Sequence, residues 1–387
     1  MHHFNQPFLM LVLVMGFLLL RLFVSLGNAL SRPYLRRATQ LADPPLLSVL
    51  VPARNEAHNL PRLLTQLEGL SYPRLEILLL DDQSEDETPV LLAAQAARDT
   101  RFGWLRGAAV PPGWLGKNWA CHQLGLAARG EYLLFVDADI AAIDPALPAR
   151  AIGELRRLGL SLLSIFPDQQ MEGWGEKIVV PLMHYVLLSL LPLWWIYRLP
   201  QTAFAAANGQ FMLFDGTAYR QHHWHARVRH IIVEDIAIMR AVKQAGLRGM
   251  AYLADGAISC RMYRSYREGL HGFGKNILAG FGGRIFALLI YLFCIYFAWV
   301  PLAGQLDKIT LLLSCGMILA INLLNSYSAR QALWRNLLLH PVQISSLALV
   351  GLLSIYKNLS GHNAWKGRNI RLPRPSSSWR SFIRSDW

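Results

Sequence analysis

The stretch Glu131-Tyr132-Leu133-Leu134-Phe135-Val136-Asp137-Ala138-Asp139 is an apolar run that ends abruptly in two aspartates. Leu133 to Val136 is typical of a short buried strand, so the aspartates are expected in the loop that follows it. Two carboxylates this close repel one another unless a cation lies between them. The pattern therefore indicates a site for Mg²⁺ or Mn²⁺. The alternative is that one aspartate caps a turn and the other is solvated.

The composition is too apolar for an ordinary soluble enzyme. Of the 387 residues, 53% are hydrophobic and only 16% are charged, and the net charge is +13. A basic excess beside apolar segments fits an anionic membrane surface. There is no zinc spacing, helix-turn-helix signature or basic stripe interleaved with aromatics, so we expect a membrane as partner and no nucleic acid. The four scattered cysteines indicate reduced, packed thiols rather than a disulfide framework.

The N-terminal segment, residues 1–31, is predicted to be a transmembrane anchor. Phe8 to Leu30 is almost entirely apolar, and about 20 such residues suffice to span the hydrocarbon core. The alternative, a cleaved signal peptide, would need a basic start and a small-x-small cleavage site, and neither is present. Because Arg32, Arg36 and Arg37 follow the segment, the positive-inside bias places the next domain in the cytoplasm and the protein in the inner membrane.

After a proline-containing linker the pattern changes to short apolar runs that alternate with amphipathic helices. This alternation predicts an α/β fold with a mostly parallel sheet over residues 46–280. Strands are predicted at Leu46–Val51 and Leu75–Leu80. Because ligands bind beyond the carboxyl ends of such strands, the polar loops Pro52–Glu56 and Asp81–Ser84 are expected at the binding site.

Four ordered motifs resemble those of family-2 glycosyltransferases, whose GT-A fold is Rossmann-like with a mostly parallel sheet. They are Pro52-Ala53-Arg54-Asn55-Glu56, Asp81-Asp82-x-Ser84, Asp137-Ala138-Asp139 and Val233-Glu234-Asp235. Gly116–Ala120 and Met262–Gly269 resemble a membrane-bound branch that glycosylates lipids such as carotenoids, hopanoids or sphingolipids. The resemblance covers residues 46–280. It implies an inverting hexosyltransferase that moves a sugar from a nucleotide diphosphate donor, a UDP-sugar, to a membrane lipid acceptor.

Within this resemblance the donor site is assigned to the loops at the strand ends. Asp81 or Asp82 is suited to accept a hydrogen bond from uracil N3–H. Arg54 and Glu56 are assigned to ribose and phosphate, and Lys117 either meets the diphosphate or is a surface charge. The predicted donor-binding set is Pro52, Arg54, Glu56, Asp81, Asp82, Lys117 and Asp137. The predicted metal ligands are Asp137 and Asp139, whose cation would neutralise the departing diphosphate.

Asp235 is the candidate catalytic base. Inverting transfer requires a base that removes the acceptor hydroxyl proton as the oxocarbenium-like centre forms. Asp235 stands at a predicted helix start, where the helix N-terminus is expected to favour its anionic form. The alternative is that Glu234 and Asp235 are an ordinary capping pair. Four residues are assigned to the diphosphate and acceptor side: Glu234, Gln210, Arg264 and Arg267.

A second apolar run covers residues 178–197. It contains prolines and ends in Trp194-Trp195-Ile196-Tyr197-Arg198, so it predicts one or two helices in the membrane interface. A full crossing is the alternative, although it would separate Asp139 from Asp235 by a bilayer. The nearby histidines, His222, His223 and His225, match no zinc spacing, so they are either surface residues or a supplement to the metal site.

Residues 284–356 return to membrane-like composition. Three apolar segments are predicted at Phe286–Pro301, Ile309–Leu324 and Leu337–Ile355. Three crossings would carry the basic tail at 357–387 to the side opposite the catalytic domain, against the positive-inside bias. One of the segments is therefore expected to re-enter or to lie in the interface.

Two other functions stay open at this point. One is a polyprenyl-phosphate or processive polysaccharide synthase, which the absence of a Gln-x-x-Arg-Trp motif near Met262–Gly269 disfavours. The other is a membrane scaffold that keeps an inactive glycosyltransferase fold.

Overall fold

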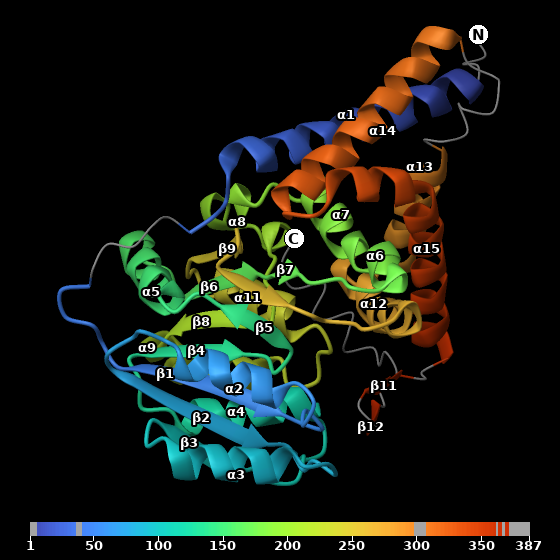
Figure 1. Cartoon of the computed structure of the whole chain (residues 1–387). Coiled ribbons are helices and arrows are strands. Elements are labelled where there is room, and N and C mark those ends of the chain that lie inside the picture. Colours follow the sequence, from blue (N-terminus) through green and yellow to red (C-terminus); the bar gives the residue numbers. More distant parts are fainter. Residues whose placement is uncertain (1–5, 36–40, 298–306, 361–362, 366–367, 371–387) are drawn as a thin grey trace.

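The computed structural model describes residues 6–35, 41–297, 307–360, 363–365 and 368–370. Figure 1 shows an α/β domain built around one large sheet, and a group of long helices that lie on one side of it. The basic tail beyond residue 370 and the arginines Arg36 and Arg37 are outside the described residues, so the side of the membrane on which the α/β domain lies stays a prediction.

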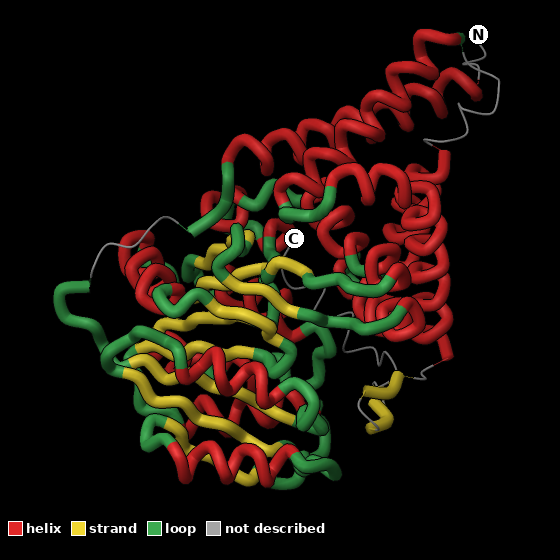
Figure 2. Tube along the Cα trace, viewed as in Figure 1, coloured by secondary structure: helices red, strands yellow, loops and turns green. Residues whose placement is uncertain are grey.

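A seven-stranded sheet forms the centre of the α/β domain (Figure 2). Its strands are β1 (Leu47–Ala53), β2 (Leu75–Asp81), β3 (Phe102–Arg106), β4 (Tyr132–Val136), β6 (Leu162–Phe166), β8 (Phe211–Asp215) and β9 (Gly249–Leu253). They lie in the order β3-β2-β1-β4-β8-β6-β9. β8 is antiparallel to both of its neighbours and the other pairs are parallel. The predicted α/β fold with a mostly parallel sheet is confirmed.

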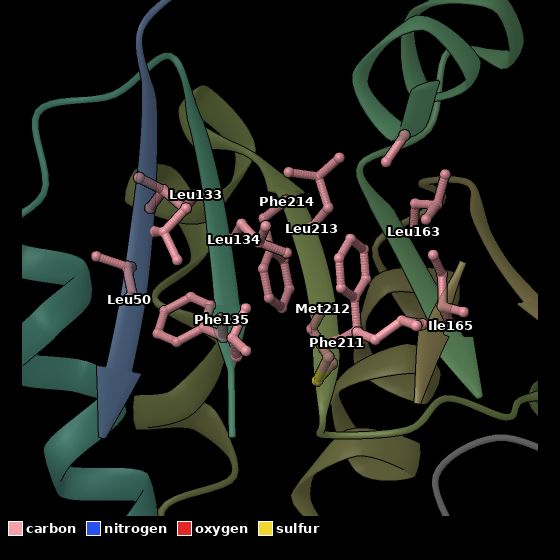
Figure 3. Close-up of a cluster of buried hydrophobic side chains, with 14 of the residues drawn as sticks. Leu50, Leu133, Leu134, Phe135, Leu163, Ile165, Phe211, Met212, Leu213 and Phe214 are labelled. Atoms are coloured by element: carbon pink, nitrogen blue, oxygen red, sulfur yellow. The ribbon is translucent and has the colours of Figure 1, made fainter. Parts of the chain in front are cut away.

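β4, the strand that precedes Asp137 and Asp139, lies in the middle of this sheet. All of its residues are buried, and because side chains alternate between the two faces of a sheet, both faces must be covered. Figure 3 shows its Phe135 beside Phe214 of β8. The two rings meet edge to face, with their centroids 5.6 Å apart. This packing anchors the strand whose end carries Asp137 and Asp139.

Helices and short strands complete the α/β domain. The helices are α2 (Leu60–Glu68), α3 (Thr88–Arg98), α4 (Gly116–Ala127), α5 (Leu147–Leu158), α9 (Gly216–His222), α10 (Trp224–Arg227) and α11 (Glu234–Gln244). A three-stranded sheet consists of β5 (Ile140–Ile143), β10 (Ile258–Cys260) and β7 (Asp168–Gln169), and β11 (Asn363–Trp365) pairs with β12 (Arg368–Ile370). The order of strands and helices agrees with the predicted alternation of apolar runs and amphipathic segments.

Three helices in the described part of the chain are long and apolar enough to cross a membrane. They are α1 (Gln6–Ser31), α14 (Lys308–Ser328) and α15 (Leu333–Ser360). α1 and α14 run side by side away from the α/β domain (Figure 1). Many of their large apolar side chains are exposed in this arrangement, which fits contact with hydrocarbon rather than water.

The first of the three predicted C-terminal segments differs from the other two. It forms α13 (Ile285–Phe297), which follows α12 (Tyr266–Gly280) after a bend of 111°. Gly282 and Gly283 in the bend have φ values of 68° and 73°, a backbone region that glycine adopts without strain. The α12–α13 pair is therefore either a broken span or a re-entrant loop, and which of the three predicted segments does not cross the membrane stays a prediction.

Residues 178–197 do not form one long helix. They contribute to α6 (Trp174–Val179), α7 (Pro181–Leu190) and α8 (Trp194–Arg198), each of which is too short to cross a bilayer. α7 packs against α1 and α14. The Asn28 side chain in α1 donates hydrogen bonds of 2.9 Å to the carbonyl oxygens of Leu188 and Leu191. These short helices thus join the α/β domain to the long apolar helices.

Candidate functional site

A cavity of about 1250 Å³ begins at the carboxyl ends of β1, β2 and β4 and extends to α7, α12 and α15. This volume exceeds the roughly 300–1,000 Å³ of an ordinary small-molecule pocket. Most of the predicted site residues line it: Pro52, Arg54, Glu56, Asp82, Lys117, Asp137, Asp139, Gln210, Glu234 and Asp235. Loops that are far apart in the chain therefore meet in one cavity, as expected for the carboxyl edge of such a sheet.

Three predicted residues do not line the cavity. Asp81 is buried, and its carboxylate accepts a hydrogen bond of 3.0 Å from the backbone N–H of Ser84. Arg264 is exposed and donates to the Asn59 side chain at 2.9 Å, and Arg267 is also exposed. Of the predicted Asp81 and Asp82 pair, only Asp82 is in position to contact a ligand in the cavity.

Arg54 connects the two loops at the ends of β1 and β2. Its Nη1 donates hydrogen bonds of 2.8 Å and 2.7 Å to the carbonyl oxygens of Asp82 and Gln83. Its guanidinium therefore fixes the shape of the cavity wall, and the ribose and phosphate contact expected of it stays a prediction.

Lys117 lies between two carboxylates. It enters from the first turn of α4, and its Nζ lies 2.8 Å from Asp137 Oδ2 and 2.8 Å from Glu234 Oε1. Burial opposes the charged ammonium, but the attraction of Asp137 and Glu234 outweighs it and holds the pKa of Lys117 well above its ordinary value. The ammonium ties the Asp-Ala-Asp loop to the start of α11.

Asp139 has one satisfied and one unsatisfied oxygen. Its Oδ2 accepts a hydrogen bond of 2.7 Å from Gln210 Nε2, while the buried Oδ1 has no partner among the described residues. Burial and the neighbouring charge of Asp137 raise the pKa of Asp139 to about 7. A buried carboxylate oxygen without a donor, next to a second carboxylate, fits a divalent cation.

The protein supplies only part of a coordination shell at this point. No group of three or more His, Cys, Asp or Glu side chains in the described chain is arranged to hold a metal ion by itself. Mg²⁺-type sites commonly combine one or two carboxylates with phosphate oxygens of the substrate. Asp137 and Asp139 therefore suit a cation that binds together with a diphosphate.

Asp235 lies at the start of α11 and receives backbone hydrogen bonds. Its Oδ2 accepts a bond of 3.0 Å from the N–H of Gly209, and its Oδ1 accepts one of 2.7 Å from the N–H of Ile236. Burial and the charge of Glu234 raise the pKa of Asp235 to about 7. The helix N-terminus was expected to favour the anion, but burial and the like charge outweigh these bonds. The resulting pKa suits a general base at neutral pH.

Gly209 is a site residue to which the sequence motifs assign no role. A Cβ atom added to it would lie 3.1 Å from Lys117 Nζ and 3.2 Å from Glu234 Oε1, closer than most side chains allow. Glycine at this position therefore lets the backbone approach the Lys117 cluster. Its place next to Gln210, which is assigned from the sequence to the diphosphate and acceptor side, was the available signal.

The other end of the cavity is largely apolar, although α12 and α15 also place Lys275, Asn276 and Lys357 in its wall. Its wall includes residues from three helices: Leu187, Leu190 and Leu191 near the end of α7, Phe273 and Ile277 from α12, and Leu347 and Val350 from α15. α7 and α15 contact α14, and α7 also contacts α1. This end of the cavity is thus built from the group of helices that contains the candidate membrane spans.

The histidine cluster lies elsewhere. His222, His223 and His225 do not line the cavity. His225 is buried with its Nδ1 2.7 Å from the Tyr219 hydroxyl, and burial lowers its pKa to about 3. His222 stacks on Trp224, with ring centroids 4.4 Å apart. His222 and His225 are thus engaged in packing in the α9–α10 region rather than in the predicted metal site.

Comparison with known proteins shows what the α/β domain is similar to. Residues 48–181 match the family model "Glycosyl transferase family 2". The chain is 24% identical over 237 residues to a 4,4'-diaponeurosporenoate glycosyltransferase of Staphylococcus haemolyticus, a match that covers 60% of this chain and 61% of that relative. It is 33% identical over 117 residues to a beta-monoglucosyldiacylglycerol synthase of Trichormus variabilis, covering 30% of this chain and 25% of that relative.

A solved structure shares the fold over most of the chain. The mannosyltransferase PcManGT from Pyrobaculum calidifontis, in complex with GDP-Man and Mn²⁺, superposes with a TM-score of 0.60 at 16% identity, and the match covers 91% of this chain and 97% of that one. The predicted resemblance to family-2 glycosyltransferases of the GT-A fold, and to relatives that are named for lipid substrates, is confirmed.

Proposed function

The chain carries a family-2 glycosyltransferase domain, and on this basis we propose that it transfers a sugar from a nucleotide diphosphate donor to a membrane lipid, with inversion at the sugar. The observation that carries the proposal is that one cavity joins a carboxylate-lined end, at the strand ends, to an apolar end built from the membrane-side helices. A polar donor and an apolar acceptor require these two environments side by side. The relatives named above, a 4,4'-diaponeurosporenoate glycosyltransferase and a beta-monoglucosyldiacylglycerol synthase, support a lipid acceptor.

The donor is proposed to bind between the β1, β2 and β4 loops. Asp82 faces the cavity and is suited to the N3–H of uracil, which favours a UDP-sugar. Lys117 is the nearest cation to the two carboxylates of the Asp-Ala-Asp motif and is suited to meet the diphosphate once it arrives. The solved mannosyltransferase named above contains GDP-Man, so experiment must decide whether the nucleobase of the donor is uracil or guanine.

The residues proposed to hold a Mg²⁺ or Mn²⁺ ion are Asp137 and Asp139. The unpartnered Asp139 Oδ1 supports this assignment, as does the Mn²⁺ in the mannosyltransferase complex. When bound, the cation would neutralise the charge that develops on the departing nucleoside diphosphate. Gln210 orients Asp139 through the hydrogen bond to its other oxygen.

Asp235 is proposed as the base. Its carboxylate is held by the N–H groups of Gly209 and Ile236, so it has a fixed position at the junction of the two ends of the cavity. It would accept the proton of the acceptor hydroxyl as that oxygen bonds to the sugar C1 and the C1–O bond to the diphosphate breaks. Glu234 raises the proton affinity of Asp235 and keeps Lys117 in place.

The protein is proposed to lie in the inner membrane with the α/β domain in the cytoplasm, where nucleotide sugars are made. α1, α14 and α15 supply the candidate spans. The basic residue Arg32, at the end of α1 next to the α/β domain, supports the cytoplasmic side.

The test is sugar transfer by the purified full-length protein in a neutral detergent. Radiolabelled UDP-glucose or GDP-mannose is incubated with a bacterial lipid extract and Mg²⁺ or Mn²⁺, and the label is followed into the organic phase. We expect donor-dependent labelling of lipid that is lost in Asp139→Asn and Asp235→Asn. Label in a water-soluble polymer would favour a polysaccharide synthase instead, and no transfer from any nucleotide sugar would favour the scaffold.

A further inference from the structure

The cavity wall contains an arginine that has no partner among the described residues. Arg240 of α11 is half-buried and lines the cavity, and within the described chain it has neither a hydrogen bond nor an ion pair. The other lysine and arginine side chains of the wall do have partners: Arg54, Lys117, Lys275 and Lys357. Arg240 thus differs from every other permanent cation of this cavity.

A partly buried guanidinium without an anion is energetically unfavourable. Burial alone lowers the pKa of Arg240, and no carboxylate counters this effect. Withdrawing a charge from water costs free energy unless an opposite charge or hydrogen bonds compensate. An anion that enters the cavity would provide that compensation, and a guanidinium offers carboxylate and phosphate two parallel hydrogen bonds.

Arg240 lies on the membrane side of the candidate base. It follows Asp235 by five residues, a rise of about 7.5 Å along a helix. Three residues further on, Lys243 donates hydrogen bonds to the carbonyl oxygens of Ile196 and Leu199 in and after α8. α8 in turn meets α1, where a Cβ on Gly27 would overlap the Trp194 ring. α11 therefore runs from the carboxylates toward the membrane helices.

Part of the cavity wall beside α11 is apolar. α11 contacts the short helix η1 (Thr202–Phe204), and Ala203 and Ala205 beside it line the cavity, as do Leu187 and Leu191. The donor end already contains its own cation, Lys117, which is engaged by Asp137 and Glu234. An anion at Arg240 would hence belong to a molecule that also has a large apolar part.

We propose that Arg240 binds an anionic head group, a carboxylate or a phosphate, of an apolar acceptor that enters the cavity from the membrane. This inference rests on the proposed function and narrows its acceptor to an anionic amphiphile. The anionic group and the apolar chain would occupy the space between Arg240 and the α7 leucines, which leaves the accepting oxygen near Asp235.

Binding of short amphiphiles to the full-length protein in neutral detergent tests this proposal without relying on catalysis. Dissociation constants are measured from tryptophan fluorescence for laurate, dodecyl phosphate and 1-dodecanol, with inorganic phosphate as a separate ligand. We expect each anionic amphiphile to bind at least about tenfold more tightly than the alcohol, a difference of 1.4 kcal/mol. A preference for only one of the two anions would assign the head group to that class.

Arg240→Gln is expected to abolish this preference, while Arg240→Lys retains part of it as a point charge. The matched control is Arg106→Gln, which neutralises an exposed arginine of β3 outside the cavity. It lowers the +13 net charge by the same amount and should keep the preference, so it separates the role of Arg240 from an effect of overall charge. UDP binding and the melting temperature of each variant show whether its fold is intact.

The proposal is overturned if the protein binds laurate, dodecyl phosphate and dodecanol equally, if Arg240→Gln keeps the preference, or if inorganic phosphate competes as well as dodecyl phosphate. Sugar transfer in the same preparations separates the two proposals. Transfer to lipid without an anion preference removes only the role of Arg240. An Arg240-dependent preference without any transfer removes the proposed function and, with it, the identification of the anion as an acceptor.

Discussion

The two ends of the cavity satisfy their charges in different ways. At the carboxylate-lined end, where we propose that the donor binds, the polar side chains are bound to one another: Lys117 to Asp137 and Glu234, and Gln210 to Asp139. At the largely apolar end, where we propose that the acceptor binds, Arg240 is the cation that has neither a hydrogen bond nor an ion pair among the described residues. The first arrangement fixes side chains before any ligand arrives, and the second leaves both space and charge for a ligand to fill.

This difference predicts separate effects of mutation. The donor end stands on the strand ends of a rigid sheet, so changes there should affect the chemical step or donor binding. The acceptor end consists of helices that also pack in the membrane group, so changes there should affect only the acceptor.

Asp235→Asn should lower kcat by roughly 10²- to 10⁴-fold, because an amide cannot accept the acceptor proton. The donor KM should change little, since Asp235 is not assigned to the donor. Steady-state kinetics with the labelled donor measure both. Glu87→Gln, an exposed change outside the cavity, serves as the control. A variant that keeps more than a tenth of the wild-type kcat would remove Asp235 from the mechanism.

The same base predicts the sign of the pH dependence. Because the pKa of Asp235 is raised to about 7, its basic form is lost as the pH falls below 7, and kcat should fall with it by up to tenfold per pH unit. A pH profile of kcat between 5 and 9 measures this effect. An acid limb with a midpoint near 4 would show that the carboxylate titrates like an exposed aspartate.

Gly209→Ala should lower kcat by about 10- to 100-fold, since the added methyl group displaces Lys117 and Glu234, and small misplacements in a reacting site carry such costs. Gly153→Ala in α5 is a matched control, because no atom lies within 4 Å of its added Cβ. Equal activity of the two variants would mean that the close approach at Gly209 has no part in catalysis.

Asp139→Asn should stabilise the donor-free protein at pH 8 while it abolishes metal-dependent transfer. The folded-state pKa of about 7 lies above the ordinary 3.8, so Asp139 contributes stability below pH 4 that is lost as the pH rises through 7. The asparagine lacks this loss, so Asp139→Asn should be more stable than the wild-type protein at pH 8. Thermal unfolding at several pH values tests this: the advantage of Asp139→Asn should shrink toward pH 4, and a constant difference would contradict it.

Leu187→Asn should raise the KM for the lipid acceptor by about tenfold, as expected from the 1.5–3 kcal/mol of a buried leucine, and leave the donor KM unchanged. Its control is Leu126→Asn in α4, which is exposed and outside the cavity. A parallel change in donor KM would show that the two ends are not independent.

The convergence of the loops was predictable from sequence because it follows from the sheet. The apolar run of β4 predicts a buried strand. Because the carboxyl ends of parallel strands meet at one edge of the sheet, Asp82 and Asp139 were expected to lie near one another, and both line the cavity. The bend between α12 and α13 also had a visible signal, the pair Gly282 and Gly283.

Side-chain partners were not predictable in the same way. Asp81 and Asp82 are neighbours in one motif, but only the folded loop shows that Asp81 turns to the Ser84 N–H. Arg54 has the same charge as Arg240, yet the first binds loop carbonyls and the second binds nothing in the described protein. Such differences depend on which elements pack together over long sequence separations, and local patterns do not contain that information.

The central claim is that the donor and a lipid acceptor occupy the two ends of one cavity at the same time. Its most direct measurement is the dissociation constant of UDP with Mn²⁺, determined for the wild-type protein with and without saturating dodecyl phosphate. We predict that both ligands bind together and that the UDP constant stays nearly unchanged. Strict competition between UDP and the amphiphile would contradict the account, because it would mean that both occupy the same end.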